Sequence, residues 1–172
     1  MNKPNDPRIA QLEMPPGMID FSAGQPSPSL LPLKLLRKAA ADRLNGDDAA
    51  FLAYGANQGN GFFRTALAGF LSEHYRFPVE AEQLFITAGA SVGLDLLCTL
   101  FARPGDTIFV EEPSYFLALR IFADHHLNII GLPMDADGLI AEALEEKLTR
   151  YTPVFLYTIP TFHNPSRVTR GA

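Results

Sequence analysis

The sequence predicts an α/β fold in which a mainly parallel sheet is covered by helices on both faces. From Gln83 onward, short apolar runs alternate with segments of helical periodicity. The lengths of both are typical of strands joined by crossover helices. The chain has 172 residues, 47% of them hydrophobic and 19% charged, which is the composition of a globular domain rather than of a disordered chain.

Residues 1–35 are predicted to form an N-terminal arm, followed by a domain over residues 36–172. The arm is rich in prolines, at Pro4, Pro7, Pro15, Pro16, Pro26, Pro28 and Pro32. Because proline lacks the N–H group that helices and ladders use, we expect an extended segment that lies on another surface. Helical spacing of apolar residues predicts the first helix from about Leu33 to Leu44.

A glycine-rich loop over residues 54–61 precedes the second predicted helix. One face of that helix carries Phe63, Leu67, Phe70, Leu71 and His74. This spacing predicts an amphipathic helix that ends before Pro78.

The remaining elements alternate along the chain. Strands are predicted at residues 84–87, 107–110, 128–131 and 154–157. Helices are predicted around residues 94–101, with Leu94, Leu97, Cys98 and Phe101 as the buried stripe, and at about 115–123 and 141–150. About a dozen residues follow the last strand, and no helix among them covers it. We therefore expect an N-terminal part of a larger fold, incomplete at its C-terminus.

Charge and cysteine content exclude several classes of function. The net charge is −5 and no basic run is present, which argues against nucleic acid or an anionic membrane as the partner. A single cysteine, Cys98, builds neither an internal disulfide nor a thiolate metal cluster. His125 and His126 are expected at a solvated helix end rather than in a metal site. The proline-broken N-terminus is not typical of a signal peptide, so we expect a cytoplasmic protein.

The segment Gly89-Ala90-Ser91-Val92-Gly93 lies where a predicted strand meets a helix, and three interpretations are open. Small residues at a helix N-terminus can bind a phosphate through backbone N–H groups and the helix dipole. The same letters match G-x-S-x-G, the nucleophile elbow of serine hydrolases. A tight turn that serves packing alone is the third interpretation. We favour phosphate, because an elbow is normally preceded by several strands and residues 1–82 show almost no strand pattern.

Two further segments follow predicted strands at the same edge of the sheet. Tyr115 comes directly after the strand at 107–110, and Asn164 follows the strand at 154–157. Ligands of open α/β sheets bind at the carboxyl ends of strands. Tyr115 can present its ring there and Asn164 its amide, although a packed aromatic and a simple Asn-Pro turn are the plainer interpretations.

Five segments, taken in order, carry a resemblance to a known family. They are Phe21-Ser22-Ala23-Gly24-Gln25-Pro26, Tyr54-Gly55-Ala56-Asn57-Gln58-Gly59, Thr87-Ala88-Gly89-Ala90-Ser91, Glu112-Pro113-Ser114-Tyr115 and Pro160-Thr161-Phe162-His163-Asn164-Pro165-Ser166. Together they resemble the N-terminal portion of class I, fold-type I aminotransferases that use pyridoxal 5′-phosphate, and among these the aminoadipate and kynurenine branch. The resemblance spans nearly the whole chain.

The resemblance implies a role for each of these segments. Gly89, Ala90 and Ser91 would hold the cofactor phosphate, Tyr115 would stack on the pyridine ring and Asn164 would bond its phenolic oxygen. Tyr54 would reach the cofactor of a second subunit in a homodimer, and Gly24 would line the substrate side. The implied reaction is amino transfer between an amino acid and a 2-oxo acid.

Two departures from the family pattern bear on activity. Arg167 stands where the family has glycine. The family also places an Asp for the pyridine nitrogen, a Schiff-base Lys and a carboxylate-binding Arg beyond the segments found here, and Lys3, Lys34, Lys38 and Lys147 do not match that lysine's setting. The resemblance therefore implies a fragment without a catalytic lysine and without activity of its own. A serine hydrolase at Ser91, or a non-catalytic remnant that binds a partner, are the alternatives.

Overall fold

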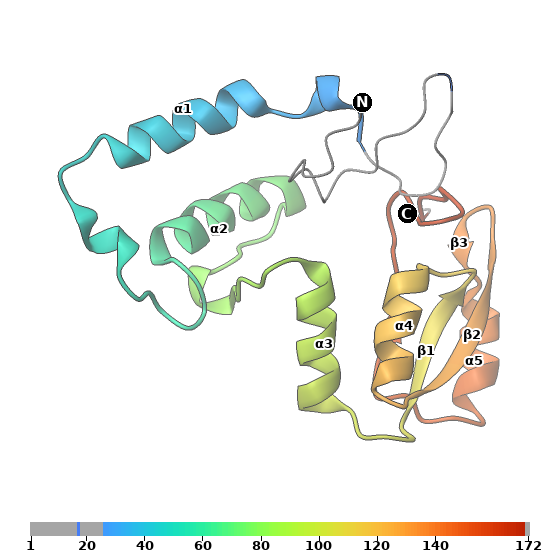
Figure 1. Ribbon diagram of the computed structural model, residues 1–172. Helices are drawn as coiled ribbons and strands as arrows, with labels where there is room; N and C mark the ends of the chain where they lie inside the picture. The colour runs from blue at the N-terminus through green and yellow to red at the C-terminus, as the bar shows by residue number, and fades with distance from the viewer. Residues whose placement is uncertain (1–16, 18–25, 171–172) are drawn as a thin grey trace, which may run out of the picture. The chain divides into compact units, whose positions relative to one another are not determined.

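The computed structural model describes residues 17 and 26–170 of the chain (Figure 1). Its helices are η1 (Pro28–Leu30), α1 (Leu33–Leu44), η2 (Ala49–Leu52), α2 (Gly61–Tyr75), η3 (Ala81–Gln83), α3 (Ala90–Phe101), α4 (Phe116–Asp124) and α5 (Ala141–Leu148). Its strands are β1 (Thr107–Glu112), β2 (Asn128–Asp135), β3 (Gly138–Leu139) and β4 (Leu156–Tyr157). The described residues fall into two compact units, divided between Tyr54 and Gly55.

Within the described residues the strands form one sheet in the order β3-β2-β1-β4. β1 pairs in parallel with β2, with Thr107 opposite Asn128, and in parallel with β4, with Phe109 opposite Leu156. β2 and β3 form an antiparallel hairpin. The predicted fold class, a mainly parallel sheet in an α/β fold, is confirmed.

Side chains of β1 alternate between two apolar clusters, one on each face of the sheet. Ile108 and Val110 point to the face covered by α3 and α4, where they pack with Cys98, Ala118 and Phe122. Phe109 points to the opposite face, where it packs with Leu132, Leu139 and Leu144 of α5. This alternation is the two-residue period of a strand, and both faces are buried because crossover helices lie on both.

The predicted strand at residues 84–87 is wrong. Leu84 has extended dihedral angles, φ −98° and ψ 131°, yet no described strand pairs with this segment. Its Ile86 N–H donates instead to the carbonyl of Gln58, 2.9 Å away. The apolar composition therefore predicted the extended backbone correctly. A segment becomes a β-strand, however, only when a neighbouring strand pairs with it.

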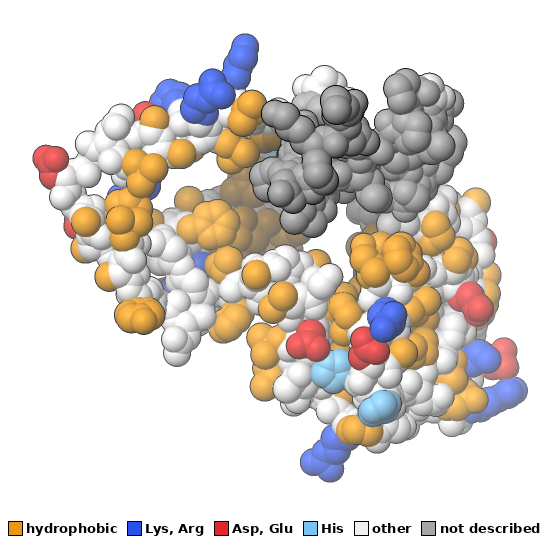
Figure 2. Space-filling view, viewed as in Figure 1, with side chains coloured by type: hydrophobic (Ala, Val, Ile, Leu, Met, Phe, Trp, Pro, Cys, Tyr) orange, Lys and Arg blue, Asp and Glu red, His pale blue; other side chains and the backbone are white. Residues whose placement is uncertain are grey.

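The apolar stripes predicted on α2 and α3 are only partly buried. On α2 Ala68 is buried, while Phe63 and Phe70 are more than half exposed. On α3 Cys98 is buried, while Leu97 and Phe101 stay exposed. Figure 2 shows apolar side chains at the surface over α2 and, in the other unit, over α1. No residue of α1 is buried.

Among the helices of the described ranges, none combines the length and the apolar character needed to cross a membrane.

Candidate functional site

The loops that follow β1 and β4 and the first turns of α3 and α4 share one edge of the sheet. β1, β2 and β4 are parallel, so their carboxyl ends meet there. α4 begins directly after β1 and therefore starts at this edge. α3 ends at the opposite edge, where residues 102–106 lead into β1, so its N-terminus also lies toward the carboxyl edge (Figure 1). Such an edge is where open α/β sheets bind ligands.

The N-terminus of α3 is open. Gly89 is its N-cap, with φ 92° and no side chain to cap the helix. The N–H groups of Ala90 and Ser91 belong to the first turn and have no intrahelical partner. A Cβ on Gly89 would meet no atom within 4 Å, and both following residues are exposed. Backbone donors and the positive end of the helix dipole therefore face free space, which suits an anion.

The loop after β1 brings Ser114 and Tyr115 to the same edge. Tyr115 is the N-cap of α4, half-buried against the cluster of Val110 and Phe122. Ser114 Oγ is buried and has no hydrogen-bond partner among the described residues. A buried hydroxyl without a partner is costly, so this atom fits a site that a polar ligand completes.

Asn164 lies in a turn within the loop that follows β4. The loop closes on itself, since the N–H of His163 donates to the carbonyl of Val168 at 2.8 Å and that of Arg170 to Pro160 at 2.8 Å. The Asn164 side chain is exposed. Its amide is free to donate to or accept from a ligand.

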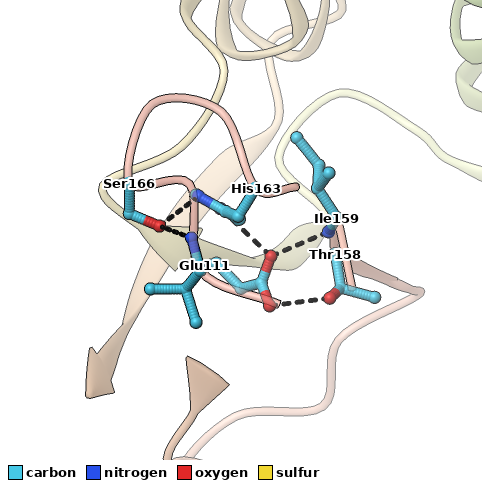
Figure 3. A network of polar contacts seen from close by, with 6 residues as sticks. Glu111, Thr158, Ile159, His163 and Ser166 are labelled. Carbon is cyan, nitrogen blue, oxygen red and sulfur yellow. Dashed lines mark hydrogen bonds and ion pairs between the residues drawn. The ribbon is translucent and has the colours of Figure 1, made fainter. Parts of the chain in front are cut away.

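A buried carboxylate lies beneath this loop. Glu111, at 2% exposure, accepts hydrogen bonds from Thr158 Oγ1 at 2.7 Å and from the Ile159 N–H at 2.8 Å (Figure 3). Nε2 of His163, itself 1% exposed, lies 3.3 Å from Glu111 Oε2 without the alignment of a hydrogen bond. Nδ1 of the same ring lies 2.9 Å from Ser166 Oγ. The network joins β1 to the loop that carries Asn164.

Tyr157 lies at the end of β4, just before the loop that carries Asn164. Burial raises the pKa of Tyr157, and nearby Tyr115 and Glu111 raise it further.

Some of the site residues predicted from the sequence lie at the carboxyl edge of the sheet, and others do not. Gly89, Ala90, Ser91, Tyr115 and Asn164 all lie on elements of residues 55–170 that reach the carboxyl edge. Tyr54 is fully exposed at the end of the other unit. Gly24 lies outside the described residues.

The nucleophile-elbow interpretation of Ser91 gains no support. Within residues 26–170 three imidazoles have other partners: His163 contacts Ser166 and Glu111, His125 contacts Asp95 at 2.8 Å, and His74 contacts the carbonyl of Phe70 at 2.7 Å. None is within hydrogen-bond distance of Ser91. An activated serine needs such a base.

An apolar groove of about 350 Å³ lies between α3 and the segment of β4. It is lined by Leu94, Leu97, Phe101 and Val154–Tyr157. Its lining side chains are largely apolar, which does not suit an anion.

Comparison with known proteins identifies the family of the chain. Residues 16–166 match the family described as aminotransferase class I and II. The chain belongs to this family. It is 34% identical, over 88% of its length, to aromatic-amino-acid aminotransferase 1 of Thermococcus litoralis. That match covers 38% of the relative, so the chain spans well under half the length of the curated relatives it matches.

Two solved aminotransferases share the fold of this family member. LysN, the α-aminoadipate aminotransferase of Thermus thermophilus in complex with N-(5′-phosphopyridoxyl)-L-leucine, has 32% identity and a TM-score of 0.78 over 88% of the chain and 37% of the neighbour. The kynurenine aminotransferase of Pyrococcus horikoshii has 31% identity and a TM-score of 0.79, over 88% and 38%. The resemblance to the aminoadipate and kynurenine branch is confirmed, as is a pyridoxal-type cofactor in a relative.

Sequence reasoning missed Glu111, Thr158 and the contacts of His163. A signal was present, because Glu111 is a charged residue that continues the buried apolar run of β1. A carboxylate in such a position is normally paired. Its partners lie 47 and more positions away, so only the fold identifies them.

Proposed function

We propose that this aminotransferase chain carries the half of an active site that holds pyridoxal 5′-phosphate. The observation that supports it best is the open N-terminus of α3 at the carboxyl edge of the sheet, formed by Gly89, Ala90 and Ser91. The cofactor phosphate is a dianion, and a helix N-terminus with free N–H groups is suited to one.

The other residues at this edge fit the rest of the cofactor. Tyr115 offers an aromatic face for a planar ring, and Asn164 an amide for the ring oxygen. The partnerless Ser114 hydroxyl adds a polar group that a bound ligand can satisfy. When bound, the cofactor acts as an electron sink for amino-acid chemistry, and the reaction class of the family is amino transfer between an amino acid and a 2-oxo acid.

The chain of 172 residues is proposed not to complete this reaction by itself. Residues 55–172 contain one lysine, Lys147, in the last turn of α5. α5 runs away from the carboxyl edge, and the chain returns to the start of β1 at Val154, whose N–H donates to Thr107. Lys147 therefore lies at the opposite edge of the sheet. Lys34 and Lys38 lie on the exposed helix α1 of the other unit.

A homodimer is proposed as the working assembly. Tyr54 is fully exposed, and α1 presents Leu33, Leu35 and Leu36 to the surface at 61–67% exposure. Exposed apolar side chains of this kind are typical of an interaction surface. In such a dimer Tyr54 contacts the cofactor of the second subunit and Gly24 the substrate. A cytoplasmic location remains a prediction from the sequence.

Equilibrium dialysis against pyridoxal phosphate and against pyridoxal, which lacks the phosphate, tests the proposal. We expect the phosphate form to bind about tenfold tighter. Ala90→Pro keeps the helix, because proline is accepted at its first position, yet removes one N–H donor. It should weaken binding of the phosphate form alone.

Ala141→Pro is the matched control, since Ala141 is the first residue of α5. It should leave both affinities unchanged, and thermal melts of both variants report that the fold is kept. Equal binding of pyridoxal and its phosphate by the unmodified chain would overturn the proposal.

A further inference from the structure

The geometry points to Glu111 as the positioning residue that holds Asn164 at the carboxyl edge. This inference rests on the proposed function and adds a residue to it. Glu111 is on β1, whereas Asn164 is in the loop after β4. In this proposal Glu111 does not contact the cofactor. It acts on Asn164 through the loop.

The carboxylate of Glu111 is buried, so it needs hydrogen-bond partners. A charge at 2% exposure is strongly unfavourable unless it is hydrogen-bonded or paired. Both oxygens are satisfied, Oε1 by the Thr158 hydroxyl and Oε2 by the Ile159 N–H. Both donors belong to the residues that directly follow β4, so the carboxylate ties the start of the loop to β1.

The loop needs the hydrogen bonds to Glu111 because the pairing between β4 and β1 is short. β4 pairs with β1 over only two positions, the last being Val110 with Tyr157. Beyond Tyr157, the side-chain hydrogen bonds that join the described loop to β1 all end on Glu111. His163 then extends the same contact, with Nε2 3.3 Å from Oε2 and Nδ1 against Ser166.

Asn164 is flanked in the sequence by residues of this network. His163 precedes it and Ser166 follows two residues later, and the two side chains contact one another across the turn (Figure 3). The main chain of Glu111 also leads, within four residues, to Tyr115. One residue thus sets the relation between the proposed ring-stacking side chain and the proposed ring-oxygen partner.

The test uses the full chain, labelled with ¹⁵N-asparagine, and follows the Asn164 side-chain amide during titration with pyridoxal phosphate. In the unmodified protein we expect saturable shifts at Asn164 and, in a uniformly labelled sample, at Ala90 and Ser91. Glu111→Ala should keep the shifts at Ala90 and Ser91, lose that at Asn164, and weaken binding about tenfold. Glu111→Gln keeps one acceptor for Ile159 and a donor for Thr158, and should restore most of the Asn164 shift.

Thr158→Val supplies a milder variant should Glu111→Ala fail to fold. It removes one bond to Glu111 and should reduce the Asn164 shift. Thr99→Val is its matched control, because Thr99 Oγ1 bonds only the Asp95 carbonyl within α3. Unchanged Asn164 shifts in Thr158→Val and Glu111→Ala would overturn the positioning role. Absence of shifts at Ala90 and Ser91 in the unmodified chain would instead overturn the proposed function.

Discussion

A Cβ atom on Gly59 would lie 2.6 Å from Cγ1 of Ile86, and Gly59 has φ 105°. Gly59 is in the glycine-rich loop before α2, and Ile86 is in the extended segment before α3. Their backbones are joined as well, since the Ile86 N–H donates to the carbonyl next to Gly59, that of Gln58. The loop therefore contacts the segment that leads into the proposed phosphate-binding turn.

Gly59→Ala should destabilise the protein by about 2–3 kcal/mol, because it combines a left-handed backbone with overpacking against Ile86. The free energy of unfolding from denaturant titration measures this. Gly61→Ala is the matched control at the first position of α2, where no atom lies within 4 Å of the new Cβ. It should be neutral or stabilising by up to about 1 kcal/mol. Equal effects of the two substitutions would contradict the contact.

Arg167→Gly should stabilise the Asn164 loop. Arg167 has φ 64°, a region that costs a side-chain-bearing residue about 1 kcal/mol relative to glycine. The denaturation midpoint should rise at constant slope. Arg76→Gly, at φ 58° after α2, should also raise the midpoint. Arg103→Gly is the control and should not raise it, because Arg103 is not among the positive-φ residues. A lower midpoint for Arg167→Gly would show that the arginine side chain stabilises the turn.

Cys98 should react slowly with thiol reagents in the native protein. Its side chain is 1% exposed, and burial, aided by the Asp95 carboxylate, raises the pKa of the Cys98 thiol. The thiolate is the reactive form, so at pH 8 labelling should be about 100-fold slower than in guanidinium chloride. A thiol introduced by Ala123→Cys, on the exposed side of α4, should react quickly and serves as the control.

The raised pKa also predicts a dependence of stability on pH. The folded state favours the neutral thiol, so its stabilising contribution is complete below the ordinary thiol pKa. It is lost as the pH rises through the higher folded value. The free energy of unfolding should therefore fall more steeply above about pH 9 than in Cys98→Ala. Identical pH profiles would contradict burial of this thiol.

Local patterns predicted most of the fold. The helical period predicted α1 with its observed bounds, Leu33–Leu44, because a helix depends on contacts within a few residues. The segment at 84–87 was wrong because a strand also needs a neighbour. β3 was missed because two residues are too few to show a strand pattern; it forms a hairpin in which Asp135 pairs with Gly138.

The candidate site was predicted only in part, because local sequence patterns do not predict contacts between distant segments. Tyr115 and Asn164 each follow an apolar run that forms a strand, which predicts the edge they share, whereas the run before Ser91 forms no strand. Glu111 and His163 form a contact between distant segments that no local period encodes. The sequence indicated His163 only as part of the segment 160–166, and the structure places it against Glu111 and Ser166.

Ser91 should stay unlabelled by a fluorophosphonate probe, because none of the described histidines lies within hydrogen-bond distance to activate it. Mass spectrometry of the treated protein identifies any modified serine, with a known serine hydrolase as the positive control. Stoichiometric modification of Ser91 would support the hydrolase interpretation and contradict the phosphate site.

A chemical-shift map of the uniformly ¹⁵N-labelled chain tests whether the carboxyl edge of the sheet binds pyridoxal phosphate. As an aldehyde, the ligand can also react with exposed lysines, and such nonspecific reaction would shift signals near those lysines. We predict saturable shifts at one equivalent, grouped at Gly89, Ala90, Ser91, Tyr115 and Asn164. Shifts confined to the surroundings of Lys34, Lys38 and Lys147, rising without saturation, would contradict binding at the carboxyl edge.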